Sequence, residues 1–280
     1  MERTFDRHVA RAPIERVSGG ERERRGDELA VEEPLEIRVD GEPLAVTMRT
    51  PGEDEELAVG FLAGEGLIAG PADIAGVGPT EDLAANIVEV HTSAGLRRDA
   101  ASERRFYLRS SCGVCGKGAL EHIRQWAPPA AGSRPLGSEV VLRAPAEARA
   151  AQRAFERTGG LHATALFDVD GEMLVVREDV GRHNAMDKAI GSMLLAGRFP
   201  LPDAFACLSG RASFELVQKA SLAGLFGIVA VGAPSTLAVE LANDRDMLLC
   251  GFVRGDSFNV YAGSHRLRTG PGSAPPGVLS

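Results

Sequence analysis

The feature that most constrains the fold is a regular alternation of short apolar runs and helical patterns in the second half of the chain. The apolar runs cover residues 204–208, 227–231 and 247–252, and helices are expected between them over 213–223 and 235–242. Short continuous apolar runs are typical of strands buried on both faces, and strands that alternate with helices form a mainly parallel, covered sheet. The pattern therefore predicts an α/β fold for this part of the chain.

Further elements are expected before this unit. Asp-Gly pairs between alternating apolar residues indicate β-hairpins, and acidic residues ahead of an apolar face indicate the start of a helix. The expected elements are a hairpin over 36–49 around Asp40-Gly41, a helix over 54–67, strands at 87–91 and 104–108, helices over 119–126 and 144–157, a hairpin formed by 162–169 and 172–177, and a helix over 184–196.

Composition divides the chain into five parts. Arg- and Glu-rich, Pro- and Gly-rich and low-complexity segments separate two regions with regular apolar patterns. The prediction is a disordered lead at 1–28, an α+β domain at 29–127, a linker at 128–138, an α/β domain at 139–268 and a disordered tail at 269–280.

Charge and hydropathy exclude several function classes. The net charge is −8, which argues against general nucleic-acid binding because backbone phosphates need Lys and Arg. The longest stretch of small apolar residues, 220–233, is too short and too Gly-rich to cross a bilayer. The N-terminus alternates charges and has no apolar signal segment, so a cytoplasmic location is expected. The negative net charge still allows a small anionic ligand to bind where basic side chains are locally concentrated.

A Cys-x-x-Cys pair in a glycine-rich loop is the sharpest local motif. Cys112 and Cys115 stand beside Lys117 and ahead of the expected helix over 119–126. A neighbouring thiol, a cation and a helix N-terminus all favour the thiolate, which is the reactive form of cysteine. Such a pair can attack an electrophile, carry a second sulfur atom or close a disulfide. A mobile nucleophilic sulfur carrier is the favoured interpretation.

Three other interpretations of the pair stay open. Half of a structural zinc site would need two further ligands, and only Cys207 and Cys250 are available as cysteines. A thioredoxin-like redox pair and two unreactive buried thiols are the others. Cys207 and Cys250 themselves lie within expected strands, where they are interpreted as small buried hydrophobes.

Three polar stretches, 177–184, 209–213 and 232–236, each lie beside an expected strand. In open α/β sheets, ligands bind outside the carboxyl ends of the strands, and helix N-termini attract anions. Arg182 and Arg211 would supply positive charge. Ordinary helix caps and turns are the alternative for any single stretch. The candidate ligand-binding residues are Arg182, His183, Ser209, Gly210 and Arg211. No P-loop or Gly-x-Gly-x-x-Gly pattern is present.

Two histidines and a C-terminal stretch complete the candidates. His183 suits acid–base chemistry, capping or ligand binding. His162 lacks the His-x-Glu context of zinc deaminases, which argues against deaminase chemistry. The stretch 251–261 combines a strand end, an Arg and aromatic residues, and fits either a site for a flat heterocycle or a final hairpin.

These motifs together resemble the FdhD/NarQ family of formate dehydrogenase accessory sulfur carriers. The resemblance rests on Ser-Cys-Gly-Val-Cys-Gly at 111–116, Arg-Glu-Asp-Val-Gly-Arg-His-Asn-Ala at 177–185 with Asp187-Lys188, Ser-Gly-Arg-Ala-Ser at 209–213, Gly-Phe-Val-Arg-Gly at 251–255 and Phe-Asn-Val-Tyr at 258–261. It covers about residues 34–266, and the set of motifs is far more specific than any one of them.

The resemblance implies a specific sulfur transfer. Family members take persulfide sulfur from a cysteine desulfurase and pass it to the molybdenum or tungsten bis-pterin guanine dinucleotide cofactor of formate dehydrogenase. Cys112 would carry the persulfide, and Cys115 would assist or share that role. The cofactor-binding segment would comprise Phe252, Val253, Arg254, Gly255, Asp256 and Ser257.

The resemblance also implies an architecture. The second region would be a cytidine deaminase-like α/β/α sandwich behind a smaller N-terminal α+β domain, and the protein would form a homodimer. The zinc ligands of deaminases are absent from the sequence, so no permanently bound metal is expected. Two alternative functions remain: a cofactor-binding chaperone without sulfur transfer, and a thiol-redox or zinc-stabilised protein.

Overall fold

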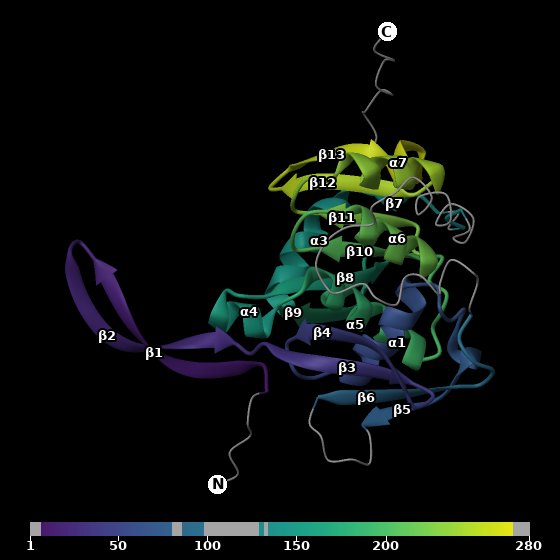
Figure 1. Ribbon diagram of the computed structural model, residues 1–280. Coiled ribbons are helices and arrows are strands. Elements are labelled where there is room, and N and C mark those ends of the chain that lie inside the picture. Colours follow the sequence, from purple (N-terminus) through teal and green to yellow (C-terminus); the bar gives the residue numbers. More distant parts are fainter. Residues whose placement is uncertain (1–6, 80–85, 98–128, 132–133, 271–280) are drawn as a thin grey trace.

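The structure is a computed structural model, and it describes residues 7–79, 86–97, 129–131 and 134–270. Cys112 and Cys115, the expected strand at 104–108, the expected helix over 119–126 and residues 271–280 of the expected tail all lie outside the described residues. Within these ranges the chain is a mixed α/β protein with several sheets (Figure 1).

A six-stranded sheet forms the centre of the second region (Figure 1). Its order is β13-β12-β11-β10-β8-β9, and its strands are β8 (His162–Asp168), β9 (Met173–Asp179), β10 (Ala204–Leu208), β11 (Gly227–Ala230), β12 (Leu248–Arg254) and β13 (Ser257–Ala262). The predicted apolar strands and the hairpin that turns at Asp170-Gly171 are confirmed.

The expectation of a mainly parallel sheet is wrong. Only β10, β11 and β12 run parallel to one another, whereas β8, β9 and β13 pair antiparallel to their neighbours. The reason lies in the connection from β9 to β10. It crosses over β8 and restores the direction of β9, so the hairpin strand β8 is enclosed between two strands of opposite direction.

A four-stranded sheet of order β4-β3-β6-β5 forms the first region. Its strands are β3 (Glu33–Val39), β4 (Glu42–Arg49), β5 (Ile74–Pro79) and β6 (Ile87–Thr92), and they accompany helix α1 (Asp54–Gly64) and the short 3-10 helix η1 (Pro71–Asp73). The predicted hairpin at Asp40-Gly41 and the predicted strand at 87–91 are confirmed. The sequence reasoning missed β5, which contains two glycines and a proline among six residues.

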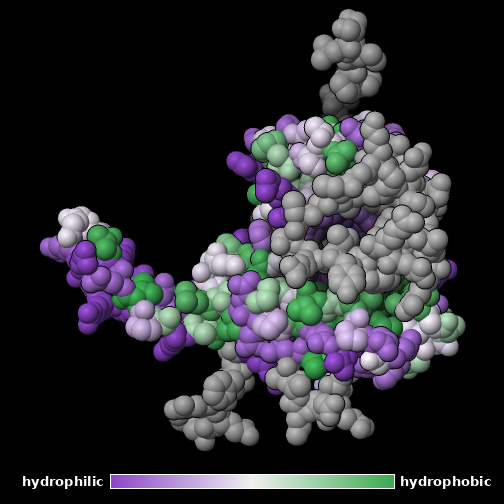
Figure 2. All heavy atoms as spheres, in the orientation of Figure 1, coloured by the Kyte–Doolittle hydropathy of each residue, from purple (hydrophilic) through white to green (hydrophobic). Residues whose placement is uncertain are grey.

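An antiparallel hairpin, here called the arm, extends from the body of the molecule (Figure 1). It comprises β1 (Val9–Ser18) and β2 (Glu21–Ala30), and the space-filling view shows mostly hydrophilic residues along it (Figure 2). The predicted disorder of residues 1–28 is therefore wrong from residue 9 onward. Gly19 and Gly20 both have positive φ, +60° and +88°, and such a pair suits the two-residue turn of a hairpin.

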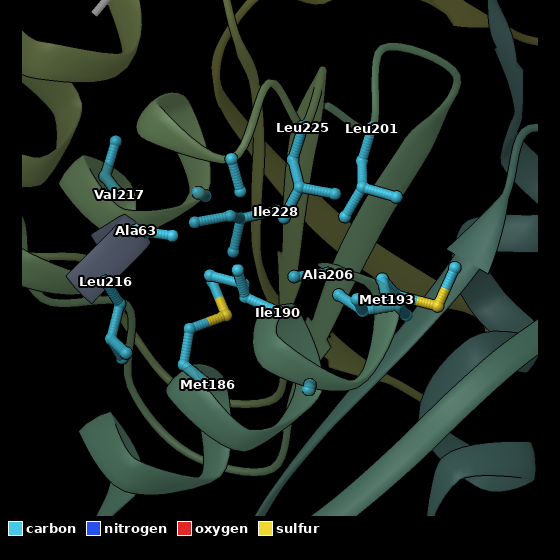
Figure 3. Packing of buried hydrophobic residues seen from close by; sticks show 14 of the residues in the cluster. Ala63, Met186, Ile190, Met193, Leu201, Ala206, Leu216, Val217, Leu225 and Ile228 are labelled. Carbon is cyan, nitrogen blue, oxygen red and sulfur yellow. The ribbon is translucent and has the colours of Figure 1, made fainter. Parts of the chain in front are cut away.

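Helices cover both faces of the main sheet. Ala206 on β10 packs with α5 (Arg182–Leu195) and α6 (Phe214–Leu222), as Figure 3 shows, and α7 (Thr236–Asp244) joins the same cluster. The next residue, Cys207, packs with α3 (Ser138–Ala151) on the opposite face. Because successive residues of a strand point to opposite faces, these contacts define a three-layer α/β/α arrangement.

The first helix of the α/β region differs from the prediction of one helix over 144–157. Helix α3 begins at Ser138, continues through Pro145 and ends at Ala151, and α4 (Arg153–Thr158) follows after a break at Gln152. The backbone of Gln152, with φ −81° and ψ 79°, is not helical. No helix within the described ranges is both long enough and apolar enough to span a bilayer.

The body of the protein is continuous across the predicted linker. Leu136 is fully buried in strand β7 (Leu136–Gly137), which pairs with β14 (Leu267–Arg268) after the 3-10 helix η3 (Ser264–Arg266). One hydrophobic cluster also includes residues from both sides of the linker, from Leu35 to Ala262. The described part of the 128–138 segment is thus held against the body.

Two glycines allow helices α1 and α5 to approach at backbone distance. A Cβ atom on Gly60 or on Gly191 would overlap a backbone carbonyl of the other helix, that of Asp187 or of Glu56. Glycine is therefore required at both positions. This contact joins the first region to the helical layer beneath the main sheet.

Candidate functional site

The polar stretches predicted from the sequence converge at one edge of the main sheet. Ser209–Arg211 follow β10, Gly232 follows β11, and the segment 252–257 forms the end of β12 and its turn into β13. Backbone hydrogen bonds join them in series: Gly232 N donates to Gly210 O at 2.9 Å, and Phe252 N donates to Gly232 O at 3.1 Å. The loops therefore form one surface at the carboxyl ends of the three parallel strands.

His183 joins the N-terminus of α5 to this surface. Its Nε2 lies 2.7 Å from a carboxylate oxygen of Glu215 and 3.4 Å from the hydroxyl oxygen of Ser213. The hydrogen bond from His183 is the largest influence on the carboxyl group of Glu215, and it lowers the pKa of that group. These contacts of His183 fix α5 against α6.

Ser209 connects β10 to β8. Its hydroxyl oxygen accepts a hydrogen bond from Ala163 N at 2.8 Å, and its own N donates to Ala163 O at 3.1 Å. The neighbouring Gly210 lies against the ring of His162, because a Cβ atom on Gly210 would be 3.6 Å from Nδ1. Ser209 thus has a structural role in joining β10 to β8. The contact with Gly210 places the imidazole of His162 next to the sheet-edge surface.

Arg182 and Arg211 are two unpaired cations of this surface. Neither forms an ion pair or a side-chain hydrogen bond with the residues that the structure describes, and Arg211 is exposed. The half-buried Arg182 contributes, after burial itself, to lowering the pKa of the His162 imidazole. Unpaired guanidinium groups suit an anionic ligand.

The segment 252–257 is the tip of the final hairpin, one of the two structures that the sequence allowed. Phe252 has φ +53° and an exposed ring, and the guanidinium of Arg254 lies 5.7 Å from the centre of that ring. Val253 is buried, whereas the residues that follow it, Arg254, Gly255, Asp256 and Ser257, are exposed. A positive φ in a non-glycine residue is a strained conformation that clusters at functional sites.

The stretch 177–184 serves the fold more than the sequence suggested. Asp179 and Lys188 are fully buried and form an ion pair at 3.0 Å. Lys188 Nζ also donates to Thr50 O at 2.8 Å, and Asn184 Nδ2 donates to Met48 O at 2.7 Å and to Asp179 at 3.0 Å. These contacts attach α5 to strand β4 and its following loop. Of this stretch, the structure brings only Arg182 and His183 to the sheet edge.

A second buried ion pair lies between α5 and α6. Lys219 Nζ is 2.9 Å from one carboxylate oxygen of Asp187 and 2.9 Å from Glu65. Burial raises the pKa of the Asp187 carboxyl group to about 6, while the two carboxylates raise the pKa of Lys219. This pair completes the polar network on the α5 side of the sheet.

A pocket of about 620 Å³ opens on the opposite side of the sheet, where α3 breaks into α4. Its walls are mainly apolar and include Phe155, Val231 and Val253. Its polar lining is formed by Arg149, Gln152, His162 and Ser209. The size and the few convergent polar groups are typical of small-molecule sites. The pocket shares Ser209 and Val253 with the predicted site.

The remaining cysteines are packing residues, as predicted. Cys207 and Cys250 are buried on β10 and β12, and burial raises the pKa of each thiol to about 12. Thiols with such pKa values are inert at neutral pH. No cluster of three or more metal-binding side chains occurs in the described ranges.

The sequence reasoning did not identify the α3–α4 wall of the pocket. Gln152, Arg149 and Phe155 occupy a segment that reads as an ordinary surface helix, and no motif distinguishes them. The Gly159-Gly160 pair directly follows α4. Both glycines line the pocket.

The structure is a three-layer α/β protein, and the predicted ligand-binding residues gather at the carboxyl ends of its parallel strands. The model of the FdhD/NarQ family matches residues 30–268, so the chain belongs to that family. It is 48% identical over 271 residues to the sulfur carrier protein FdhD of Streptomyces coelicolor, covering 93% of this chain and 96% of the relative.

Further similarities agree with this membership. The chain is 48% identical to the sulfur carrier protein FdhD of Mycobacterium tuberculosis over 255 residues, which is 87% of this chain and 92% of the relative. A crystal structure described as that of a formate dehydrogenase accessory protein from Desulfotalea psychrophila superposes with a TM-score of 0.75. At 23% identity, it covers 93% of this chain and 99% of its own, and it shows that the fold is shared.

Proposed function

We propose that this chain transfers sulfur from a cysteine desulfurase to the bis-pterin guanine dinucleotide cofactor of molybdenum- or tungsten-dependent formate dehydrogenase. The observation that carries the proposal is the 48% identity, over 93% of the chain, to a protein named as a sulfur carrier, together with a Cys-x-x-Cys motif in this sequence. The unpaired Arg182 and Arg211 at the sheet edge support an anionic acceptor.

In the first step, the thiolate of Cys112 attacks the terminal sulfur of the persulfide on the desulfurase. The sulfur–sulfur bond of the donor breaks, its electron pair returns to the cysteine of the desulfurase, and Cys112 becomes a persulfide. Attack of Cys115 on the inner sulfur of Cys112 then releases hydrosulfide and forms a disulfide, so the two thiols supply both electrons. The acceptor cofactor receives that sulfide as a substrate of the reaction.

The family resemblance supports further proposals. The α/β region has a cytidine deaminase-like sandwich architecture, the protein works in the cytoplasm as a homodimer, and it contacts both the desulfurase and formate dehydrogenase. The acceptor cofactor contacts residues 252–257 together with Arg182, His183, Ser209, Gly210 and Arg211. The exposed Arg254 and Phe252 at the hairpin tip suit a flat, charged ligand.

Mass spectrometry tests the sulfur-carrier role. After incubation with a cysteine desulfurase and cysteine, the chain should gain about 32 Da, one sulfur atom, on the peptide that contains Cys112. Cys112→Ala should abolish this adduct, and Cys250→Ala should retain it because that thiol is buried. An adduct that survives Cys112→Ala would exclude Cys112 as the carrier. Failure to form any adduct would favour a cofactor-binding chaperone.

A further inference from the structure

Helix α4 buries little of its own surface. It has six residues, and only Ala154 among them is buried. Non-helical backbone at Gln152 separates it from α3, and Gly159, with φ +65°, ends it. An isolated helix of this length is not stable in water, so α4 depends on its contacts with other elements.

Two carboxylates from distant parts of the chain hold the two ends of α4. Glu178 on β9 accepts hydrogen bonds from the backbone N of Ala154 at 3.0 Å and of Phe155 at 2.7 Å. Glu28 on the arm accepts hydrogen bonds from Nε and Nη2 of Arg157, both at 2.9 Å. The hydrogen bond from Arg157 lowers the pKa of the Glu28 carboxyl group to about 2, so this pair stays charged at neutral pH. The position of α4 therefore depends on the arm.

Helix α4 and the glycines that follow it form one wall of the pocket. Phe155, Gly159 and Gly160 line the pocket from this wall, and Cys207 lines it from the sheet. The arm touches the same wall a second time, because a Cβ atom on Gly160 would lie 3.6 Å from the Cβ atom of Ala30. Figure 1 shows α4 beside the place where the arm joins the body.

We infer that α4 is a movable lid of this pocket, and that the ion pair of Glu28 with Arg157 is the latch by which the arm keeps the lid closed. The lid turns about the helix break at Gln152 and about Gly159-Gly160, where the backbone is least restricted. Because a partly exposed ion pair contributes little free energy and α4 buries one residue, the lid opens without unfolding the sheet. Lid movement controls access to the pocket and does not depend on sulfur transfer.

The pocket contains its own reporter, because the thiol of Cys207 lines it and the thiol of Cys250 lies outside it. Both thiols are buried, and burial raises the pKa of each to about 12, so their intrinsic reactivities are matched. The full-length protein carrying Cys112→Ala and Cys115→Ala is treated with methyl methanethiosulfonate, and mass spectrometry follows the two remaining thiols. Glu28→Gln should raise the reaction rate at Cys207 about two- to fivefold relative to Cys250, the effect of losing a partly exposed ion pair.

Glu15→Gln is the matched control. It makes the same change in another exposed ion pair of the arm, that of Glu15 with Arg22 at 3.3 Å. Because this pair does not touch α4, the rate at Cys207 should stay unchanged.

Arg157→Gln breaks the latch from the side of the lid. Glu28 also lies 3.5 Å from Arg11 within the arm, so this variant separates the latch from that second contact. It should accelerate the reaction at Cys207 as much as Glu28→Gln does. The double variant should add nothing further, because both changes open one latch.

Three results would overturn the inference. The first is an unchanged rate at Cys207 in Glu28→Gln. The second is equal acceleration at Cys207 and Cys250, which would show that the sheet unfolds and that no lid opens. The third is an equal effect of Glu15→Gln and Glu28→Gln, which would show that the arm does not act through the latch.

Discussion

The two sides of the main sheet use buried polar groups in opposite ways. On the α5 side, Lys188 and Lys219 are buried, and each is paired with a carboxylate and with a second acceptor. On the α3 side, the side chains of Gln152 and His162 line a pocket and make no hydrogen bond in the described part of the chain. The first set stabilises the fold, and the second set remains available to a ligand.

Helix packing is also tighter on the α5 side of the sheet than on the α3 side. Helices α1 and α5 meet at backbone distance through Gly60 and Gly191. Helix α3, by contrast, ends at Ala151 and restarts after Gln152, and about 620 Å³ of space opens beside the break. On the α5 side, the motif at 177–188 therefore contributes mainly to packing and buried ion pairs. On the α3 side, a segment without a recognisable motif lines a pocket.

The largest effect is expected from Lys188→Met. This change leaves the fully buried Asp179 without its cation, and breaking a buried ion pair in this way costs about 3–5 kcal/mol. Urea unfolding should show this loss in the free energy of unfolding. Arg198→Met, at an exposed position, should change it by less than about 0.5 kcal/mol. Similar stability of the two variants would contradict a stabilising role for the pair.

A somewhat smaller loss is expected from Gly191→Ala. The added Cβ would overlap the carbonyl of Glu56, so α1 and α5 must separate, at a cost of about 2–3 kcal/mol. Thermal unfolding measures this loss. Gly26→Ala, on the arm where nothing lies within 4 Å of the Cβ position, is the matched control. A Tm equal to that of the control would show that the helices do not depend on this contact.

The buried Asp187 should make stability depend on pH. Burial raises the pKa of its carboxyl group from 3.8 to about 6 in the folded state. Between these values the folded protein keeps a proton that the unfolded chain releases, so the free energy of unfolding should fall as pH rises from about 4 to about 6. Asp187→Asn should remove that contribution. If the urea midpoints of wild type and Asp187→Asn changed equally with pH, the raised pKa of Asp187 would be contradicted.

The smallest effect, and one of opposite sign, is expected from Gln152→Leu. The amide of Gln152 makes no side-chain hydrogen bond in the described part of the chain, so replacing it with an apolar group of similar size should leave the free energy of unfolding unchanged or raise it by about 1 kcal/mol. Urea unfolding of this variant beside Lys188→Met compares the two sides of the sheet directly. A clear loss of stability would mean that Gln152 supports the fold.

Sequence reasoning succeeded where one local pattern decides the structure. Strand β10 has the predicted bounds because five consecutive apolar residues are buried on both faces. The turn at Asp170-Gly171 and the convergence of Ser209–Arg211 with the end of β12 follow from chain order and turn chemistry.

Sequence reasoning failed where the structure depends on strand pairing or on a cavity between elements. The arm has few apolar residues, and only cross-strand pairing around Gly19-Gly20 makes it a hairpin. The antiparallel placement of β8 depends on a crossover that no local pattern encodes. The pocket lined by Gln152 lies between two helices and a sheet, and the sequence around Gln152 is that of a surface helix.

The most direct test of the central claim follows one sulfur atom from this chain to its acceptor. The protein is loaded with ³⁵S persulfide, freed of desulfurase, and mixed with cofactor-containing, inactive formate dehydrogenase. Wild-type protein should pass the label to the cofactor as formate dehydrogenase activity appears, and Cys112→Ala should give neither label nor activity. Activity that appears while the label stays on the carrier, or that appears with Cys112→Ala, would contradict the account.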